Sequence, residues 1–159
     1  MKIGVMSDTH LREVTEKLIW IVEDLFKDTD MILHAGDLGS ETVLIYLEAM
    51  GVTAVRGNLD PVEVVRSLPA KRIIEAGTKK IGLMHGWGGY TDLAQKIRPE
   101  FGRIDCLVFG HSHFPTNEVM GNELYFNPGT ATGTPRASKN SVGFLHVDDT
   151  IRGEIITID

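Results

Sequence analysis

Acidic, amide and imidazole side chains follow several apolar runs of this chain, most of them beside a glycine. The set comprises Asp8, His10, Asp37, Asn58, His85, His111 and His113. Two pairs in the set are separated by one residue, so that on an extended backbone both side chains of a pair lie on the same face. The set has more oxygen and nitrogen donors than one tetrahedral zinc ion needs, and it suits two metal ions that share a carboxylate. We expect Asp37 to be the shared ligand.

The first half of the chain alternates strand-like and helix-like segments, which predicts parallel strands joined by helices. Strands are expected at residues 2–7, 31–33 and 52–55. The apolar spacing predicts a helix over 14–26 and a second helix that Ser40 caps and Gly51 ends. Residues 56–70 contain Gly, Asn and Pro and are expected to form a loop.

The second half is predicted to be mostly β structure. Residues 72–75 and 80–84 are expected to form an antiparallel hairpin, followed by a helix over 91–98. Further strands are expected at 106–109, 116–120, 123–126, 141–147 and 151–158. Two mixed sheets that face each other, with helices outside, account for both halves. No repeat or change of composition marks a boundary, so residues 1–159 are expected to form one α/β domain.

The polar clusters come at the carboxyl ends of the predicted strands. In open α/β sheets ligands bind beyond these ends, so we expect the clusters to converge on one site. Gly36, Gly57, Gly86 and Gly110 let the backbone turn sharply and approach the site closely.

Composition excludes several classes of protein. The chain has 159 residues, 42% of them hydrophobic, and a net charge of -6 at pH 7. This charge has the wrong sign for a surface that holds nucleic acid, so strong nucleic-acid binding is not expected. The single cysteine, Cys106, rules out an internal disulfide and is expected to be a small core residue. No apolar run is long enough to span a membrane and no signal peptide is recognised, so a cytoplasmic protein without a membrane partner is expected.

The order of the motifs resembles that of the calcineurin-like metallophosphoesterases, which is D-x-H, G-D, G-N-(H or C)-(D or E), H and G-H-x-H. The resemblance covers residues 7–129, and residues 126–130 also look like the N-P-G-(S or T) segment of one branch. The small size, without a cap domain, is most similar to the YfcE-type phosphodiesterase branch. The resemblance implies a four-layer αββα sandwich of two mixed β-sheets flanked by helices, the metallo-dependent phosphatase fold.

The resemblance also implies two divalent cations. One would be held by Asp8, His10, Asp37 and His113, and the other by Asp37, Asn58, His85 and His111. The implied reaction is phosphodiester hydrolysis by in-line attack of a hydroxide that bridges the two metals, with Asp37, Asn58 and His85 as catalytic residues that position hydroxide and phosphate. Manganese is the expected metal, and nickel, iron, cobalt and zinc suit the same ligands. The net charge of such a centre, about +1, matches a small or nucleotide-like phosphodiester anion.

Leu59 departs from the family pattern, because many relatives have a histidine here that is the usual candidate for protonating the leaving group. Leucine has no proton to give. General-acid catalysis contributes about 10²–10⁴-fold, so we expect a preference for diesters with good leaving groups. Asp60 is expected to orient neighbouring groups rather than to act as the acid.

Other functions stay open from the sequence. A retromer subunit that uses this fold for protein contacts is also similar to the superfamily. A non-catalytic protein-binding scaffold is therefore the main alternative. Retention of all the metal-ligand positions disfavours the scaffold. A phosphomonoesterase is disfavoured by Leu59, and a nuclease by the acidic charge. The edge strands, or residues 130–139, could support a homodimer or a higher homo-oligomer.

Four further residues are noted. His34 either braces the loop that carries Asp37 or packs incidentally. Trp87 either stacks on a base or aryl group of the substrate or covers apolar surface at the rim. Arg136 either holds a substrate phosphate or is an ordinary exposed arginine, and His146 is expected to be an ordinary strand residue.

Overall fold

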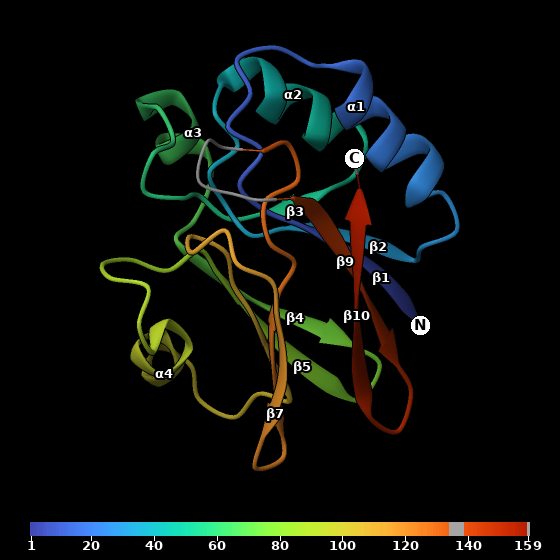
Figure 1. Cartoon of the computed structure of the whole chain (residues 1–159), viewed down its shortest axis with the longest axis vertical. Helices are drawn as coiled ribbons and strands as arrows, with labels where there is room; N and C mark the ends of the chain where they lie inside the picture. Colours follow the sequence, from blue (N-terminus) through green and yellow to red (C-terminus); the bar gives the residue numbers. More distant parts are fainter. Residues whose placement is uncertain (134–138, 159) are drawn as a thin grey trace.

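A computed structural model describes residues 1–133 and 139–158 (Figure 1). The described strands form two five-stranded mixed sheets, with the strand orders β10-β9-β1-β2-β3 and β4-β5-β6-β8-β7. Arg136 lies outside the described residues, so its predicted role stays a prediction.

The first sheet has a parallel centre and an antiparallel hairpin at one edge. Its strands are β1 (Lys2–Met6), β2 (Met31–His34), β3 (Thr53–Ala54), β9 (Asn140–Val147) and β10 (Ile151–Ile158). β1, β2 and β3 are parallel, as the alternation of strands and helices predicted. β9 runs antiparallel to β1, and β10 pairs with β9.

The second sheet is also mixed. Its strands are β4 (Lys71–Ala76), β5 (Lys79–Met84), β6 (Cys106–Val108), β7 (Thr116–Met120) and β8 (Glu123–Asn127). β4 and β5 form the predicted antiparallel hairpin. β5, β6 and β8 are parallel, so the carboxyl ends of β5 and β6 lie at the same edge of the sheet.

Short helices connect the strands. They are α1 (Glu16–Ile19), which continues as a wider helical turn over Trp20–Leu25, α2 (Glu41–Ala49), α3 (Val62–Ser67) and α4 (Leu93–Ile97), which a tight turn over Arg98–Glu100 follows. Ser40 caps α2 as predicted, because its hydroxyl accepts a hydrogen bond from Val43 N. The expectation that residues 56–70 form only a loop was wrong, since α3 lies within them. Pro61 starts α3 without a side-chain cap, and Val64 is its buried residue, so its sequence signal is weak.

Apolar side chains fill three layers. One layer packs α1 and α2 on the first sheet through residues such as Leu18, Phe26 and Leu47. A second lies between the sheets, and a third packs α4 on the second sheet through Ile97 and Leu107. The order of layers is helix, sheet, sheet, helix (Figure 1), which confirms the predicted α/β sandwich. No helix in the described part of the chain is long and apolar enough to cross a membrane.

Candidate metal centre

The predicted site residues lie where five strands end. Asp8 and His10 follow β1, Asp37 follows β2, and Asn58 follows β3, all in the first sheet. From the second sheet, His85 directly follows β5, and the segment that carries His111 and His113 follows β6. The edge of the sandwich where these strands end therefore brings together side chains from both sheets.

The residues expected around the first cation meet through their side-chain atoms. Asp8 Oδ1 lies 3.1 Å from His113 Nε2 and 3.6 Å from His10 Nε2. The two imidazole Nε2 atoms are 3.2 Å apart, and His10 Nε2 is 3.8 Å from Asp37 Oδ2. Asp8, His10 and His113 thus form a group whose donor atoms could hold one ion.

The residues expected around the second cation also meet. His85 Nε2 lies 3.2 Å from Asp37 Oδ2 and 3.0 Å from Asn58 Oδ1. His111 Nδ1 lies 2.9 Å from the same Asn58 oxygen. Asp37 Oδ2 thus faces His10 of the first group and His85 of the second. A carboxylate shared by two cations would occupy such a position between the two groups.

Backbone carbonyls orient two of the imidazoles. His85 Nδ1 is 2.7 Å from Ala35 O, and His111 Nε2 is 2.8 Å from Gly88 O. Because a carbonyl oxygen can only accept, each ring donates its N–H there and turns the lone pair of its other nitrogen toward Asn58 Oδ1. Lone pairs facing one another at 2.9 Å and 3.0 Å repel unless a further proton or a metal cation lies between them. Nitrogen, amide and carboxylate donors of this kind suit a divalent transition metal.

Each carboxylate uses one oxygen for support and directs the other into the site. Asp8 Oδ2 accepts hydrogen bonds from the Ser7 hydroxyl at 2.6 Å and from His111 N at 3.1 Å. Asp37 Oδ1 accepts one from Leu59 N at 2.8 Å. Asp8 Oδ1 is buried and has no hydrogen-bond partner among the described residues, although two imidazoles lie close to it. A buried carboxylate oxygen without a hydrogen bond is costly unless a cation compensates it, so these residues fit a metal.

Burial alone would raise the pKa of Asp8. The neighbouring imidazoles of His10, His113 and His85 and the Ser7 hydroxyl outweigh burial and hold the pKa of this carboxyl below its usual range. Asp8 is therefore ionised and ready to bind a cation at neutral pH.

The backbone is strained where the donors lie. Five of the predicted ligands have left-handed φ angles, from 49° to 68°, and these are Asp8, His10, Asp37, His111 and His113. Each such residue costs about 1–3 kcal/mol, and strain of this kind gathers at functional sites. Gly57 and Gly110 allow close approach instead, because a Cβ on Gly57 would collide with Asp37, and one on Gly110 would collide with Ser7 and Asp8.

His34 and Asp60 brace the loops of the centre. Gly36 N donates to His34 Nδ1 at 3.1 Å, and His34 Nε2 lies 3.0 Å from Thr9 Oγ1, which itself donates to Leu38 O. Burial lowers the pKa of His34 to about 3, so the ring is neutral and joins the loops after β1 and β2. Asp60 accepts hydrogen bonds from the backbone N–H groups of Asp37, Gly39 and Gly57, which agrees with the orienting role expected for it.

Several supporting residues were not identified from the sequence. Ser7 holds Asp8, Thr130 Oγ1 donates to Asp8 O at 2.7 Å, and Asn127 Nδ2 donates to Gly110 O at 2.9 Å. Asn127 and Thr130 belong to the N-P-G-T segment, which the sequence placed near the site without giving it a role. Hydroxyls and amides next to strand ends are common, so the sequence alone did not distinguish Ser7 from an ordinary loop residue.

Leu59 and Trp87 lie exposed near the centre. Leu59 is 67% exposed, and Trp87 is 44% exposed and lines a cavity of 180 Å³ together with Asn58 and His85. At this position Trp87 is compatible with both predicted roles, stacking on a base or aryl group of the substrate or covering apolar surface at the rim. His146 pairs with Glu154 on the neighbouring strand at 3.1 Å, as befits an ordinary strand residue. Burial raises the pKa of Cys106, which is a core thiol.

Sequence comparison identifies the family. The model of the calcineurin-like phosphoesterase superfamily domain matches residues 1–150, and the chain belongs to this superfamily. It is 35% identical to a probable metallophosphoesterase of Methanocaldococcus jannaschii, over 100% of this chain and 82% of that protein. It is 36% identical to a probable metallophosphoesterase of Methanothermobacter thermautotrophicus, over 98% of this chain and 92% of that protein. The chain is therefore a phosphoesterase-family protein with a candidate site for divalent metal.

Solved structures share the fold. An archaeal phosphodiesterase has a TM-score of 0.75 and 23% identity, with coverage of 99% of this chain and 100% of that one. Zinc-bound Vps29 of Entamoeba histolytica has a TM-score of 0.73 and 24% identity, and the phosphoesterase Yfce of E. coli has 0.70 and 22%. Both match over 100% of each chain.

Proposed function

We propose that this chain is a phosphodiesterase that uses two divalent cations to hydrolyse small or nucleotide-like diesters by in-line attack of hydroxide. One observation carries the proposal: the two groups of predicted metal ligands meet at Asp37 Oδ2. In the second group, the lone pairs of His85 and His111 are directed at Asn58 Oδ1. All the predicted ligand positions keep residues that bind metal, which favours catalysis over a scaffold.

In the proposed reaction, different residues of the chain have different roles. When bound, divalent cations lower the pKa of water and offset the charge that develops on the phosphate. Asp8, Asp37 and the imidazoles would hold the cations, and the backbone contacts of His85 and His111 fix which ring nitrogen is available to each. In this proposal Asn58 and His85 orient the phosphate, and the Leu59 side chain offers no proton to the leaving group.

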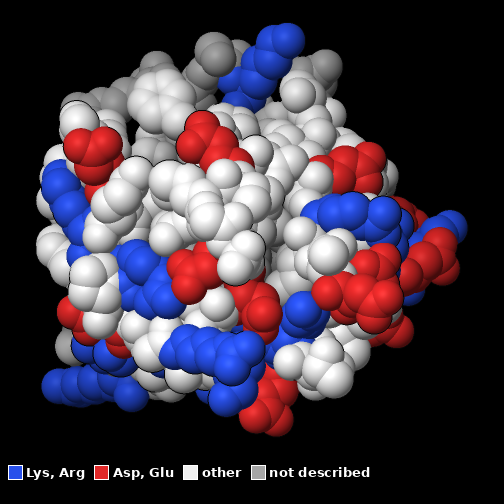
Figure 2. Space-filling model, turned by 90° about the horizontal axis from the view of Figure 1, so that it is seen from below, with Lys and Arg blue, Asp and Glu red and all other residues white. Residues whose placement is uncertain are grey.

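A scaffold role is the second candidate, and the likeness in fold to Vps29 supports it. A nuclease is less favoured. On the face in Figure 2, Lys and Arg side chains are interspersed with Asp and Glu, and the net charge is -6. Such a surface does not hold a polyanion well. Cytoplasmic location, manganese as the metal and a homo-oligomeric state stay predictions.

Metal dependence tests the proposal. The purified protein is treated with EDTA, and hydrolysis of bis(4-nitrophenyl) phosphate is followed with and without added Mn²⁺. We expect EDTA to abolish turnover and Mn²⁺ to restore it, because the proposed mechanism uses the metal cations to lower the pKa of water. Asp37→Asn should lose activity in both conditions, whereas His146→Ala should behave as the wild type. Turnover that survives thorough metal removal would contradict the proposal.

A further inference from the structure

A cavity of 250 Å³ lies beside the candidate metal centre, between α4 and β7. Residues that line the cavity also contact residues of the candidate metal centre. The Tyr90 ring packs edge-on against the His111 ring with centroids 5.3 Å apart. Ser112, which also lines the cavity, stands between His111 and His113, and Phe114 follows directly. The cavity therefore lies directly beside the candidate centre, on the side of His111.

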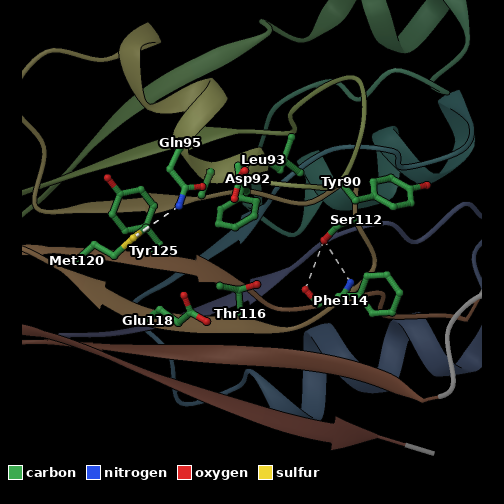
Figure 3. Close-up of a pocket in the computed structure, with 12 residues that line it drawn as sticks. Tyr90, Asp92, Leu93, Gln95, Ser112, Phe114, Thr116, Glu118, Met120 and Tyr125 are labelled. Atoms are coloured by element: carbon green, nitrogen blue, oxygen red, sulfur yellow. Dashed lines mark hydrogen bonds between the residues drawn. The ribbon is translucent and has the colours of Figure 1, made fainter.

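The lining carries negative charge without a matching positive charge. Asp92 lies at the start of α4 and Glu118 on β7, on opposite sides of the cavity (Figure 3). Neither carboxylate forms a hydrogen bond or ion pair with another described residue, and Asp92 does not cap its helix with its side chain. The described residues that line the cavity include no Lys or Arg. An anionic substituent would be repelled here, and a cationic one attracted.

Aromatic rings complete this environment. Tyr90 is 42% exposed and Phe114 is 57% exposed, and both line the cavity. The faces of such rings attract ammonium groups, by about two- to fivefold in affinity at exposed sites. The volume is below the 300 Å³ or so typical of pockets for drug-sized ligands, so the cavity suits a small group.

We infer that this cavity binds a positively charged ester substituent, such as a quaternary ammonium group, of a zwitterionic phosphodiester. The inference rests on the proposed phosphodiesterase function and names the substrate class of the same site. The phosphate would lie at the metal centre and the cation between Asp92, Glu118 and the two exposed rings. The other ester group would be the one that leaves.

Two substrates with the same leaving group test the inference. One is 4-nitrophenyl phosphorylcholine, and the other is 4-nitrophenyl 3,3-dimethylbutyl phosphate, its uncharged isostere. In both, water oxygen bonds to phosphorus, the bond from phosphorus to the nitrophenyl oxygen breaks, 4-nitrophenolate departs and the water protons pass to solvent. With the Mn²⁺-loaded protein at low salt, we expect kcat/KM to be about five- to tenfold higher for the cationic substrate.

Variants that remove the charge of Asp92 or Glu118 test whether the preference for the cationic substrate arises in this cavity. Asp92→Asn and Glu118→Gln should each reduce the ratio of the two kcat/KM values by about two- to threefold, because each removes a charge that attracts only the cationic substrate. Asn tolerates the left-handed backbone that Asp92 adopts, so the fold should be kept. Glu48→Gln, at an exposed position on α2, is the matched control and should keep the wild-type ratio.

The outcomes separate the two claims. Metal-dependent hydrolysis of both substrates at equal kcat/KM would overturn the cationic substrate class and leave the phosphodiesterase function standing. A preference that both variants keep would overturn the placement in this cavity. Failure to hydrolyse either substrate with any added divalent metal would overturn the phosphodiesterase function and the inference with it.

Discussion

His34 is not a predicted ligand, yet its two hydrogen bonds join the segments that carry Asp8 and Asp37. Replacing it by leucine leaves the Gly36 N–H buried without an acceptor and removes one of the two hydrogen bonds of the Thr9 hydroxyl, which keeps its bond to Leu38 O. We expect His34→Leu to lower the free energy of unfolding of the metal-free protein by about 2 kcal/mol at pH 7.5. Urea unfolding measures this loss, and the control change His146→Ala, at a half-buried strand position, should cost less than about 0.5 kcal/mol.

The same comparison has a defined pH dependence. Burial lowers the pKa of His34 to about 3 in the folded protein, whereas an unfolded imidazole titrates near pH 6.5. The stability that this neutral ring contributes is complete above pH 6.5 and is lost as the pH falls below it. The gap between wild type and His34→Leu should therefore shrink by about 1.4 kcal/mol per pH unit below pH 6.5. A gap that stays constant down to pH 5 would show that His34 is protonated in the fold.

The Leu59 side chain is exposed beside the centre and carries no titratable proton for a leaving group. We expect aryl diesters to turn over much faster than alkyl diesters, because only the former have leaving groups that need no acid. Leu59→His should raise the alkyl rate by about tenfold or more and change the aryl rate little. Leu59→Gln, which adds a polar group without a titratable proton, is the control. Equal rates for aryl and alkyl diesters in the wild type would contradict this account.

At the scale of elements, the turn after β3 packs closely against Asp37. A Cβ at Gly57 would collide with the Asp37 carboxylate and backbone, so Gly57→Ala must move Asp37, the proposed shared ligand. We expect this change to weaken Mn²⁺ binding by about 10–100-fold, as measured by isothermal titration calorimetry. Gly102→Ala is the control, since a Cβ there meets no atom within 4 Å. Unchanged affinity in Gly57→Ala would mean that Asp37 is not a ligand.

The sequence predicted the strands better than the helices. Strand ends are marked by abrupt changes from apolar to polar residues, as at Asp8 and Asp37, and this pattern also located the site. α3 was missed because a helix of six residues with one buried side chain has no clear periodicity. The ring nitrogens that His85 and His111 direct into the site depend on the carbonyls of Ala35 and Gly88. These contacts arise only when separate loops meet in three dimensions.

At the scale of the whole molecule, the candidate centre joins the two sheets. Asp8, Asp37 and Asn58 come from the loops of the first sheet, and His85 and His111 from those of the second. Cations held among them would link the sheets directly, in addition to the apolar layer that packs between the sheets.

Anomalous diffraction from crystals grown with Mn²⁺ tests the central claim most directly. We predict two manganese peaks per chain, one among Asp8, His10 and His113 and one among Asn58, His85 and His111, with Asp37 contacting both. Manganese that binds only elsewhere, or no peak near Asp37 at saturating Mn²⁺, would contradict the account.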